Sequence, residues 1–158
     1  MPVIHLTTFI AAPLDRVFDL ARSVDMHKFS MQGSGERIIS GVFSGLMKQN
    51  DTVTWEARHL FRKRRMQVQL SSMNRPDYFS DEQVTGPFKK MKHEHYFRPV
   101  QNGTIMIDVF YYKVPWGMIG RIVNKIILHR YMKNLLSLRN EKIRQAAESN
   151  LWKQFLQQ

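Results

Sequence analysis

A long amphipathic segment near the C-terminal end of the chain constrains the fold more than any other feature. From Pro115 to about Glu148 no further proline occurs, and the only glycines are Gly117 and Gly120. Apolar residues recur there at the i, i+3, i+4 and i+7 spacing of one helical face. The apolar positions are Ile119, Ile122, Val123, Ile126, Ile127, Met132, Leu135, Leu136, Ile143, Ala146 and Ala147. A helix of this length spans about 50 Å, so the preceding chain must supply a broad apolar partner.

The chain before this helix supplies that partner as a series of predicted strands. The side-chain period changes to two over 36–43, 51–61, 65–73, 77–84, 88–98 and 103–113. Turn signals separate these segments, among them a basic bend at 62–65 and the hairpin signal Asn102-Gly103. A further strand is predicted over 3–10, followed by a short helix from Pro13 and a second one capped by Ser23.

This order of elements predicts a single α+β domain over residues 1–158. Seven antiparallel strands in hairpin succession curl under the twist of the sheet, so the long C-terminal helix can lie on the concave side. The two short helices after the first strand would close one end. The tail 149–158 is expected to continue the long helix, to pack on a second subunit, or to reach a membrane interface. A cavity between sheet and helix would be mostly apolar with a few polar groups.

Several short motifs, taken in their order and spacing, resemble a known superfamily. They are Ala12-Pro13 with Val17-Phe18, the Gly41 to Gly45 stretch, Val53-Thr54-Trp55, Pro76-Asp77-Tyr78-Phe79-Ser80-Asp81, Gly86-Pro87-Phe88, His93-Glu94-His95-Tyr96-Phe97, Gly103-Thr104 and Asp108. Together they resemble the helix-grip fold of the START and Bet v 1-like (SRPBCC) superfamily, and more narrowly a bacterial cyclase/dehydrase-like branch that binds ligands. The resemblance implies a pocket for a hydrophobic or amphipathic small molecule. It does not imply one chemistry, because this fold carries binders, lipid carriers and some enzymes.

Strand alternation places polar residues among aromatic ones on the face that should meet the helix. The predicted ligand-lining residues are Trp55, His59, Phe61, Phe79, Gln83, Met91, His93, His95, Phe97, Met106 and Asp108 from the sheet, with Ile119, Val123 and Ile126 from the helix. Asp81 faces the same way. Buried polar groups are costly unless they are paired, so this set must bond to itself, to water or to a ligand.

Four interpretations of the inward polar residues remain open. The first is a structural network in which carboxylates fix the imidazoles, and the second is a set of polar anchors for a ligand. The third is a catalytic dyad, with His93 or His95 as acid or base and Asp81 or Asp108 orienting it. The fourth, a metal site, is the weakest, because no third ligand at defined spacing is evident and the chain has no cysteine. We expect neither a metal nor a cofactor.

The charge balance widens the range of partners. The formal net charge is +11, which attracts anionic membranes or nucleic acids, although runs of charge are most often solvated surface. Nucleic acid is the less favoured partner, because basic residues are not interleaved with stacking aromatics on one strand face. A weak contact with an anionic membrane stays open. The sequence leaves monomer and homodimer open, and the absence of a secretory charge pattern or an apolar membrane span predicts a cytoplasmic protein.

Three functions therefore compete. The first is binding or transport of a hydrophobic small molecule or lipid in a cavity between the sheet and the C-terminal helix. The second is a cyclase-, dehydrase- or hydrolase-like enzyme that uses the pocket histidines and aspartates. The third is peripheral binding to an anionic membrane. The sequence favours the first and favours a binder over an enzyme.

Overall fold

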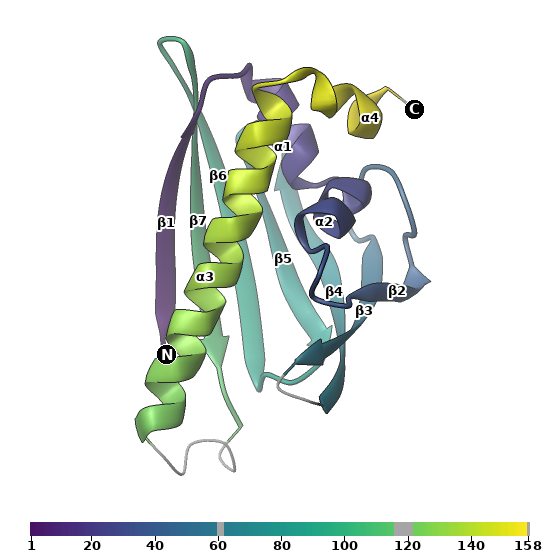
Figure 1. Ribbon diagram of the computed structural model, residues 1–158, viewed down its shortest axis with the longest axis vertical. Helices are drawn as coiled ribbons and strands as arrows, with labels where there is room; N and C mark the ends of the chain where they lie inside the picture. Colours follow the sequence, from purple (N-terminus) through teal and green to yellow (C-terminus); the bar gives the residue numbers. More distant parts are fainter. Residues whose placement is uncertain (60–61, 116–121, 158) are drawn as a thin grey trace.

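The computed structural model describes residues 1–59, 62–115 and 122–157, with side chains at 58, 59, 62 and 122–125 excepted. The elements run in the order β1 (Val3–Ile10), α1 (Leu14–Ala21), α2 (Val24–Ser30), β2 (Arg37–Gly41), β3 (Thr52–His59), β4 (Arg62–Asn74), β5 (Tyr78–Thr85), β6 (Lys90–Val100), β7 (Gly103–Lys113), α3 (Ile122–Ala147), a short 3-10 turn η2 (Asn150–Trp152) and α4 (Lys153–Leu156). The predicted fold is confirmed: a curved antiparallel sheet faces one long helix, which crosses its surface diagonally (Figure 1).

The sheet is a meander to which the first strand is added beside the last. Its order is β1-β7-β6-β5-β4-β3-β2, with every neighbouring pair antiparallel. The hairpin predicted at Asn102-Gly103 joins β6 to β7, and Asn102 has a φ of 67°. The prediction of a basic bend at 62–65 is wrong, because these residues form the first part of β4 and pair with 56–59 of β3. Regular pairing with β3 therefore makes these residues a strand, despite their run of like charge.

The long helix is buried along only part of its apolar face. Leu136, Ile143 and Ala147 are buried, whereas Ile126 and Ile127 are 65% and 56% exposed. The helix contacts β1, α1 and α2, so its C-terminal half is held by the short helices and the first strand. The expectation that the whole apolar face packs on the sheet is therefore wrong for the first described turns. The part of the predicted helix at 116–121 lies outside the described residues.

The two short helices close the end of the sheet that lies next to the C-terminal half of α3 (Figure 1). Phe18 of α1 makes edge-to-face contacts with Phe79 and Phe97, at 5.5 and 5.1 Å between ring centroids. Ser23 caps α2 as predicted, since its hydroxyl accepts a hydrogen bond from the Met26 amide at 3.2 Å. Burial of these three phenylalanines anchors α1 on the sheet, which fixes the position of the helix–sheet space.

The tail does not continue α3. The helix ends at Ala147, and the Ser149 hydroxyl accepts a hydrogen bond from the Leu151 amide, which starts a separate turn. Trp152 lies under the Arg16 guanidinium, 4.3 Å from the ring centroid, and Phe155 is buried against the Phe29 ring at 5.5 Å. The tail thus packs on α1 and α2 at the closed end through these two aromatic residues.

We predict that Gly41→Ala destabilises the fold by about 2 kcal/mol or more. Gly41 has a φ of +87°, and a Cβ built there would lie 2.1 Å from the Thr52 carbonyl oxygen, so backbone must move. Gly45→Ala is the matched control, because Gly45 has a φ of +83° with nothing within 4 Å and should lose only the left-handed penalty of about 1 kcal/mol. Denaturant unfolding of both variants measures the difference. Equal losses would show that the close approach to Thr52 is not limiting.

Candidate functional site

Three neighbouring strands bring the inward polar residues together. Asp81 of β5 pairs with His93 of β6, and His95 of β6 pairs with Asp108 of β7. Residues two apart on a strand share a face, so the side chains also meet diagonally across strands. The sequence prediction that these four residues lie on one face of the sheet is confirmed by this register. We call Asp81, His93, His95 and Asp108 the polar cluster.

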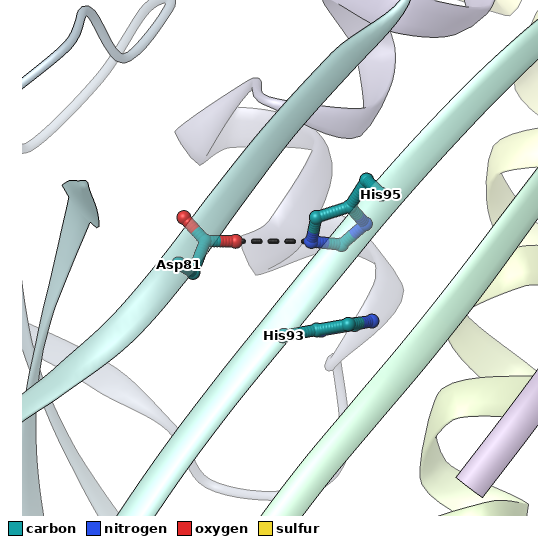
Figure 2. A group of neighbouring side chains, drawn as sticks. All are labelled: Asp81, His93 and His95. Carbon is teal, nitrogen blue, oxygen red and sulfur yellow. Dashed lines mark hydrogen bonds and ion pairs between the residues drawn. The ribbon is translucent and has the colours of Figure 1, made fainter. Parts of the chain in front are cut away.

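The hydrogen bonds of the polar cluster run diagonally. His93 Nε2 lies 2.9 Å from Asp108 Oδ1, and His95 Nε2 lies 3.0 Å from Asp81 Oδ2. Figure 2 shows the second of these bonds, with the His93 ring beside that of His95. His95 Nδ1 also lies 2.9 Å from Asp108 Oδ1. The direction of that approach does not allow a hydrogen bond, and Nδ1 has no hydrogen-bond partner within the described part of the chain, so the contact is electrostatic.

Asp108 is the centre of the polar cluster and is buried. The helix supplies two of its partners: Asn140 Nδ2 donates to Asp108 Oδ2 at 2.6 Å, and Arg139 Nη1 lies 3.5 Å from Oδ1. Burial raises the pKa of the Asp108 carboxyl, but the hydrogen bond from His93 and the close approach of His95 outweigh burial and hold that pKa well below its usual range. Asp108 is therefore ionised and can only accept hydrogen bonds.

The state of the His93 ring follows from its surroundings. Burial, together with repulsion from His95, lowers the pKa of His93 to about 4, although Asp108 acts in the opposite direction. The ring is therefore neutral at pH 7. Since ionised Asp108 only accepts, Nε2 of His93 must carry the proton and donate it, which leaves Nδ1 unprotonated. His93 also meets the edge of the Phe110 ring at 5.3 Å between centroids.

The rest of the network ties the sheet to the helices. Arg139 Nη2 donates to the Ala21 carbonyl at the end of α1 at 2.9 Å, and Asn140 Nδ2 also approaches Thr8 Oγ1 of β1 at 3.3 Å. Each of these polar groups is mostly buried and has a partner. Such mutual satisfaction is what a structural network requires, while Nδ1 of His95 has no hydrogen-bond partner among the described residues.

Asp81 differs from the other members of the polar cluster because solvent reaches it. Its side chain points to the helix side of the sheet, yet it is 22% exposed. Among the described residues, only His95 bonds to it, and it does so through Oδ2. The other oxygen is available to accept a hydrogen bond from a molecule that enters the space beside β5. Asp81 is thus the member of the cluster that could anchor a ligand.

A metal ion fits the polar cluster poorly. Asp81, His93 and His95 each offer a ligand atom, and these atoms lie within 4.8 Å of one another. The two imidazole rings are 3.9 Å apart at 39° between planes, so their in-plane lone pairs run side by side rather than meeting at a point about 2.0 Å from both. In addition, both Nε2 atoms already face carboxylates. The geometry favours a hydrogen-bonded network over a metal centre.

The other predicted ligand-lining residues occupy three kinds of position. Met91, Phe97 and Met106 are buried in the core, and Phe79 stacks on His95 at 4.1 Å between centroids. Trp55 is buried against the ring of His27, 4.2 Å away. Predicted residues outside the described part are Phe61 and Ile119, together with the side chains of His59 and Val123.

Gln83 has a role that the sequence prediction missed. Its amide donates to the Phe88 carbonyl at 2.7 Å and accepts from the Phe88 amide at 3.2 Å. Both ends of the side chain are thus used to hold the loop between β5 and β6. This use of the Gln83 amide makes it a loop-fixing residue.

An open hollow lies between the sheet and the first described turns of α3. Its volume is about 420 Å³, and its lining residues are Pro2, Tyr112, Ile126, His129 and Arg130. Tyr112 is a buried inward residue of β7, and its hydroxyl lies 3.2 Å from His129 Nδ1 of the helix. Ile126, one of the lining residues, is largely exposed, so the apolar lining of the hollow reaches the surface.

Three contributors to the site were missed at the sequence level, namely Arg139, Asn140 and the Tyr112–His129 contact. Asn140 carried a readable signal, because it lies four residues after Leu136 and three before Ile143 on the buried stripe of α3. A polar residue at such a position needs a buried partner. Arg139 carried the same signal, because it lies three residues after Leu136 and four before Ile143 and is buried as well.

Comparisons with known proteins bear on the fold. No protein-family model matches the chain, and no curated protein matches it. Among solved structures, TTHA0849 from Thermus thermophilus is 19% identical with a TM-score of 0.70, covering 94% of this chain and 100% of that one. Major latex-like protein 151 from Panax ginseng is 12% identical with a TM-score of 0.65, covering 94% and 98%. CV1439 from Chromobacterium violaceum is 10% identical with a TM-score of 0.69, covering 93% and 97%.

These likenesses extend over nearly the whole length of each chain. They show that this protein has the helix-grip fold of the Bet v 1-like proteins. At such low identity they do not carry a ligand or a reaction over to this chain. In its described part, no helix is both long and apolar enough to cross a membrane.

Proposed function

We propose that the protein binds a hydrophobic small molecule or lipid between the sheet and α3. The observation that carries this proposal is the hollow of about 420 Å³ bounded by Tyr112 of the sheet and Ile126 of the helix. Its size falls within the range of about 300–1,000 Å³ typical of small-molecule sites. The floor is an aromatic ring, and the mouth carries an exposed isoleucine, so apolar surface would be buried when a ligand enters.

The polar groups beside this space suggest which kind of hydrophobic molecule is held. His129 and Arg130 line the hollow, and Asp81 offers one unengaged carboxylate oxygen on the inner face of β5. A few polar groups in an apolar site fix the orientation of a ligand. We therefore expect an amphipathic ligand that carries a hydrogen-bonding head group. Transport of such a ligand between membranes or enzymes belongs to the same proposal.

The motif order also supports a narrower assignment, to the bacterial cyclase/dehydrase-like branch of the superfamily. The residues that carry this resemblance include Asp81, His93, His95 and Asp108. In the structure these four bond to one another and to α3. This arrangement favours a binding protein whose cluster stabilises the fold over an enzyme whose cluster reacts.

We predict that Ile126→Asp weakens binding of an amphipathic probe by about tenfold or more, because burying an isoleucine side chain contributes about 1.5–3 kcal/mol. The probe is 1-anilinonaphthalene-8-sulfonate, titrated by fluorescence in the absence of lipid. Leu138→Asp is the matched control, since Leu138 is an exposed apolar residue of the same helix away from the hollow. Its affinity should stay within about twofold of the wild type.

Mass spectrometry of the purified protein under native conditions completes the test. We expect a bound mass that organic solvent extracts and that is depleted in Ile126→Asp. Melting temperatures of both variants show whether either change unfolds the protein. Equal probe affinity in the two variants, or an empty protein with no saturable probe binding, would refute the proposed function.

A further inference from the structure

Six basic residues that have no ion-pair partner among the described residues gather at one end of the molecule. Because the strands run antiparallel in chain order, β3, β5 and β7 end at this end of the sheet, and β4, β6 and α3 begin there (Figure 1). We call it the cationic end and define it by Lys63, Arg64, Lys89, Lys90, Lys113 and Arg130. All except Arg64 are exposed, and the described residues provide none of the six with an ion-pair partner. The sequence placed these cations in separate clusters, and the fold brings the clusters together.

Basic residues even occupy directly opposite positions in the strand register at this end. Lys90 of β6 pairs with Lys113 of β7, and Arg58 of β3 pairs with Lys63 of β4. Like charges directly opposite one another destabilise a sheet. These residues therefore do not serve the stability of the isolated domain. Their summed field gives the cationic end a positive potential that attracts an extended anionic partner.

Acidic residues lie at the opposite end. They occur in α1, in the connections before β3 and between β4 and β5, and after α3, at Asp15, Asp19, Asp51, Asp77 and Glu148. Arg75 at this end is paired with both carboxylates of α1. Lys48 and Arg98 also lie at this end, so it carries charges of both signs, whereas the six residues of the cationic end are all basic; an anionic surface would therefore attract the cationic end first.

The exposed apolar residues distinguish between anionic partners. Near the cationic end, the described large apolar residues that are exposed are aliphatic: Met1, Val3, Val84, Ile126 and Ile127. The exposed phenylalanines, Phe9 and Phe43, lie towards the other end. Single-stranded nucleic acid is bound by stacking on exposed aromatic rings. Aliphatic side chains surrounded by cations instead suit the boundary between lipid head groups and acyl chains.

We propose that the cationic end docks on an anionic lipid bilayer, with Ile126 and Ile127 entering the interface. Each lysine or arginine near an anionic membrane strengthens attachment, and the attraction falls off within a Debye length. The mouth of the hollow, at Ile126 and Arg130, then faces the lipid. Docking is independent of the proposed ligand binding, and the two can fail separately.

The test is co-sedimentation of the purified full chain with vesicles. Binding should be strong to vesicles of phosphatidylcholine with about 30% phosphatidylglycerol at about 50 mM salt, weak to pure phosphatidylcholine, and reduced at least tenfold at about 500 mM salt. The key variant is Lys63→Glu/Lys90→Glu. It replaces both like-charged cross-strand pairs by opposite-charged ones, so its melting temperature should equal or exceed that of the wild type while vesicle binding falls at least tenfold.

The matched control is Lys48→Glu/Arg98→Glu. Both residues are exposed at the opposite end, and neither forms an ion pair with a described residue, so the change in net charge is the same. Its vesicle binding should stay within about threefold of the wild type. An equal loss in the two double variants, equal binding to neutral vesicles, or preferential retention on single-stranded DNA in a competition with vesicles would overturn the proposal. Probe binding in solution without vesicles reports separately on the hollow.

Discussion

Replacing Asp108 by asparagine should lower the free energy of unfolding by about 3–5 kcal/mol. Asp108 is buried and is the negative partner of Arg139, 3.5 Å away, while its two oxygens accept from His93 and Asn140. Asparagine keeps the shape but removes the charge, which leaves the buried guanidinium without its counter-ion. In addition, a donor lies at each of the two oxygen positions, His93 Nε2 at one and Asn140 Nδ2 at the other. The NH2 group of the asparagine therefore points at a donor whichever way the amide is turned.

The loss is large enough to read from thermal unfolding. For a domain of this size, 1 kcal/mol corresponds to about 2–4 °C, so Asp108→Asn should melt about 10 °C or more below the wild type. Asp77→Asn is the control: Asp77 is an exposed turn residue and should change stability by less than about 0.5 kcal/mol. A melting temperature for Asp108→Asn within about 2 °C of the wild type would show that the network contributes little to folding.

The fold was predictable because its signals are periodic. Alternation over the strands and the 3.6-residue stripe of α3 extend over many residues, so single exceptions do not change the result. The errors occurred where a local signal competed with long-range pairing. Arg62 to Arg65 were predicted as a bend but form the start of β4, since cross-strand partners on β3 determine their conformation.

The candidate site was predictable only in part, because faces can be read from a strand but distances cannot. Alternation placed His93, His95 and Asp108 on one face. It could not show that Asp108 is shared by both histidines and two helix residues, because that depends on how α3 crosses the sheet. Likewise, the exposure of Ile126 depends on where α3 stands away from the sheet, which periodicity within the helix does not encode.

Acidification should destabilise the protein already at mildly acidic pH, through His93. The pKa of His93 is about 4 in the folded protein and about 6.5 in the unfolded chain, because burial disfavours the charged ring. Between these values the unfolded chain binds the extra proton, so stability falls as the pH falls from about 6.5 to about 4. A pKa difference of about 2.5 corresponds to about 3 kcal/mol.

Asp108 extends the loss of stability to lower pH. The pKa of Asp108 is held well below its ordinary value in the fold, so its contribution is present above about pH 3.8 and disappears as the pH falls towards the folded value. Measurements between about pH 4.5 and 7 therefore separate the histidine from the carboxylates. In that window the free energy of unfolding, from denaturant titrations, should decrease by about 2 kcal/mol or more.

His93→Gln isolates the cause of this pH dependence. Glutamine can still donate to Asp108 but cannot titrate, so the free energy of unfolding should become nearly flat between about pH 4.5 and 7. His5→Gln is the control, since His5 is exposed on β1, and it should keep the slope of the wild type. The groups that face His93 are His95, Asp108 and Arg139, and a slope that survives in His93→Gln would show that His93 is not its source. A fall in the free energy of unfolding at about pH 5–6 thus shows whether a neutral imidazole is buried under α3.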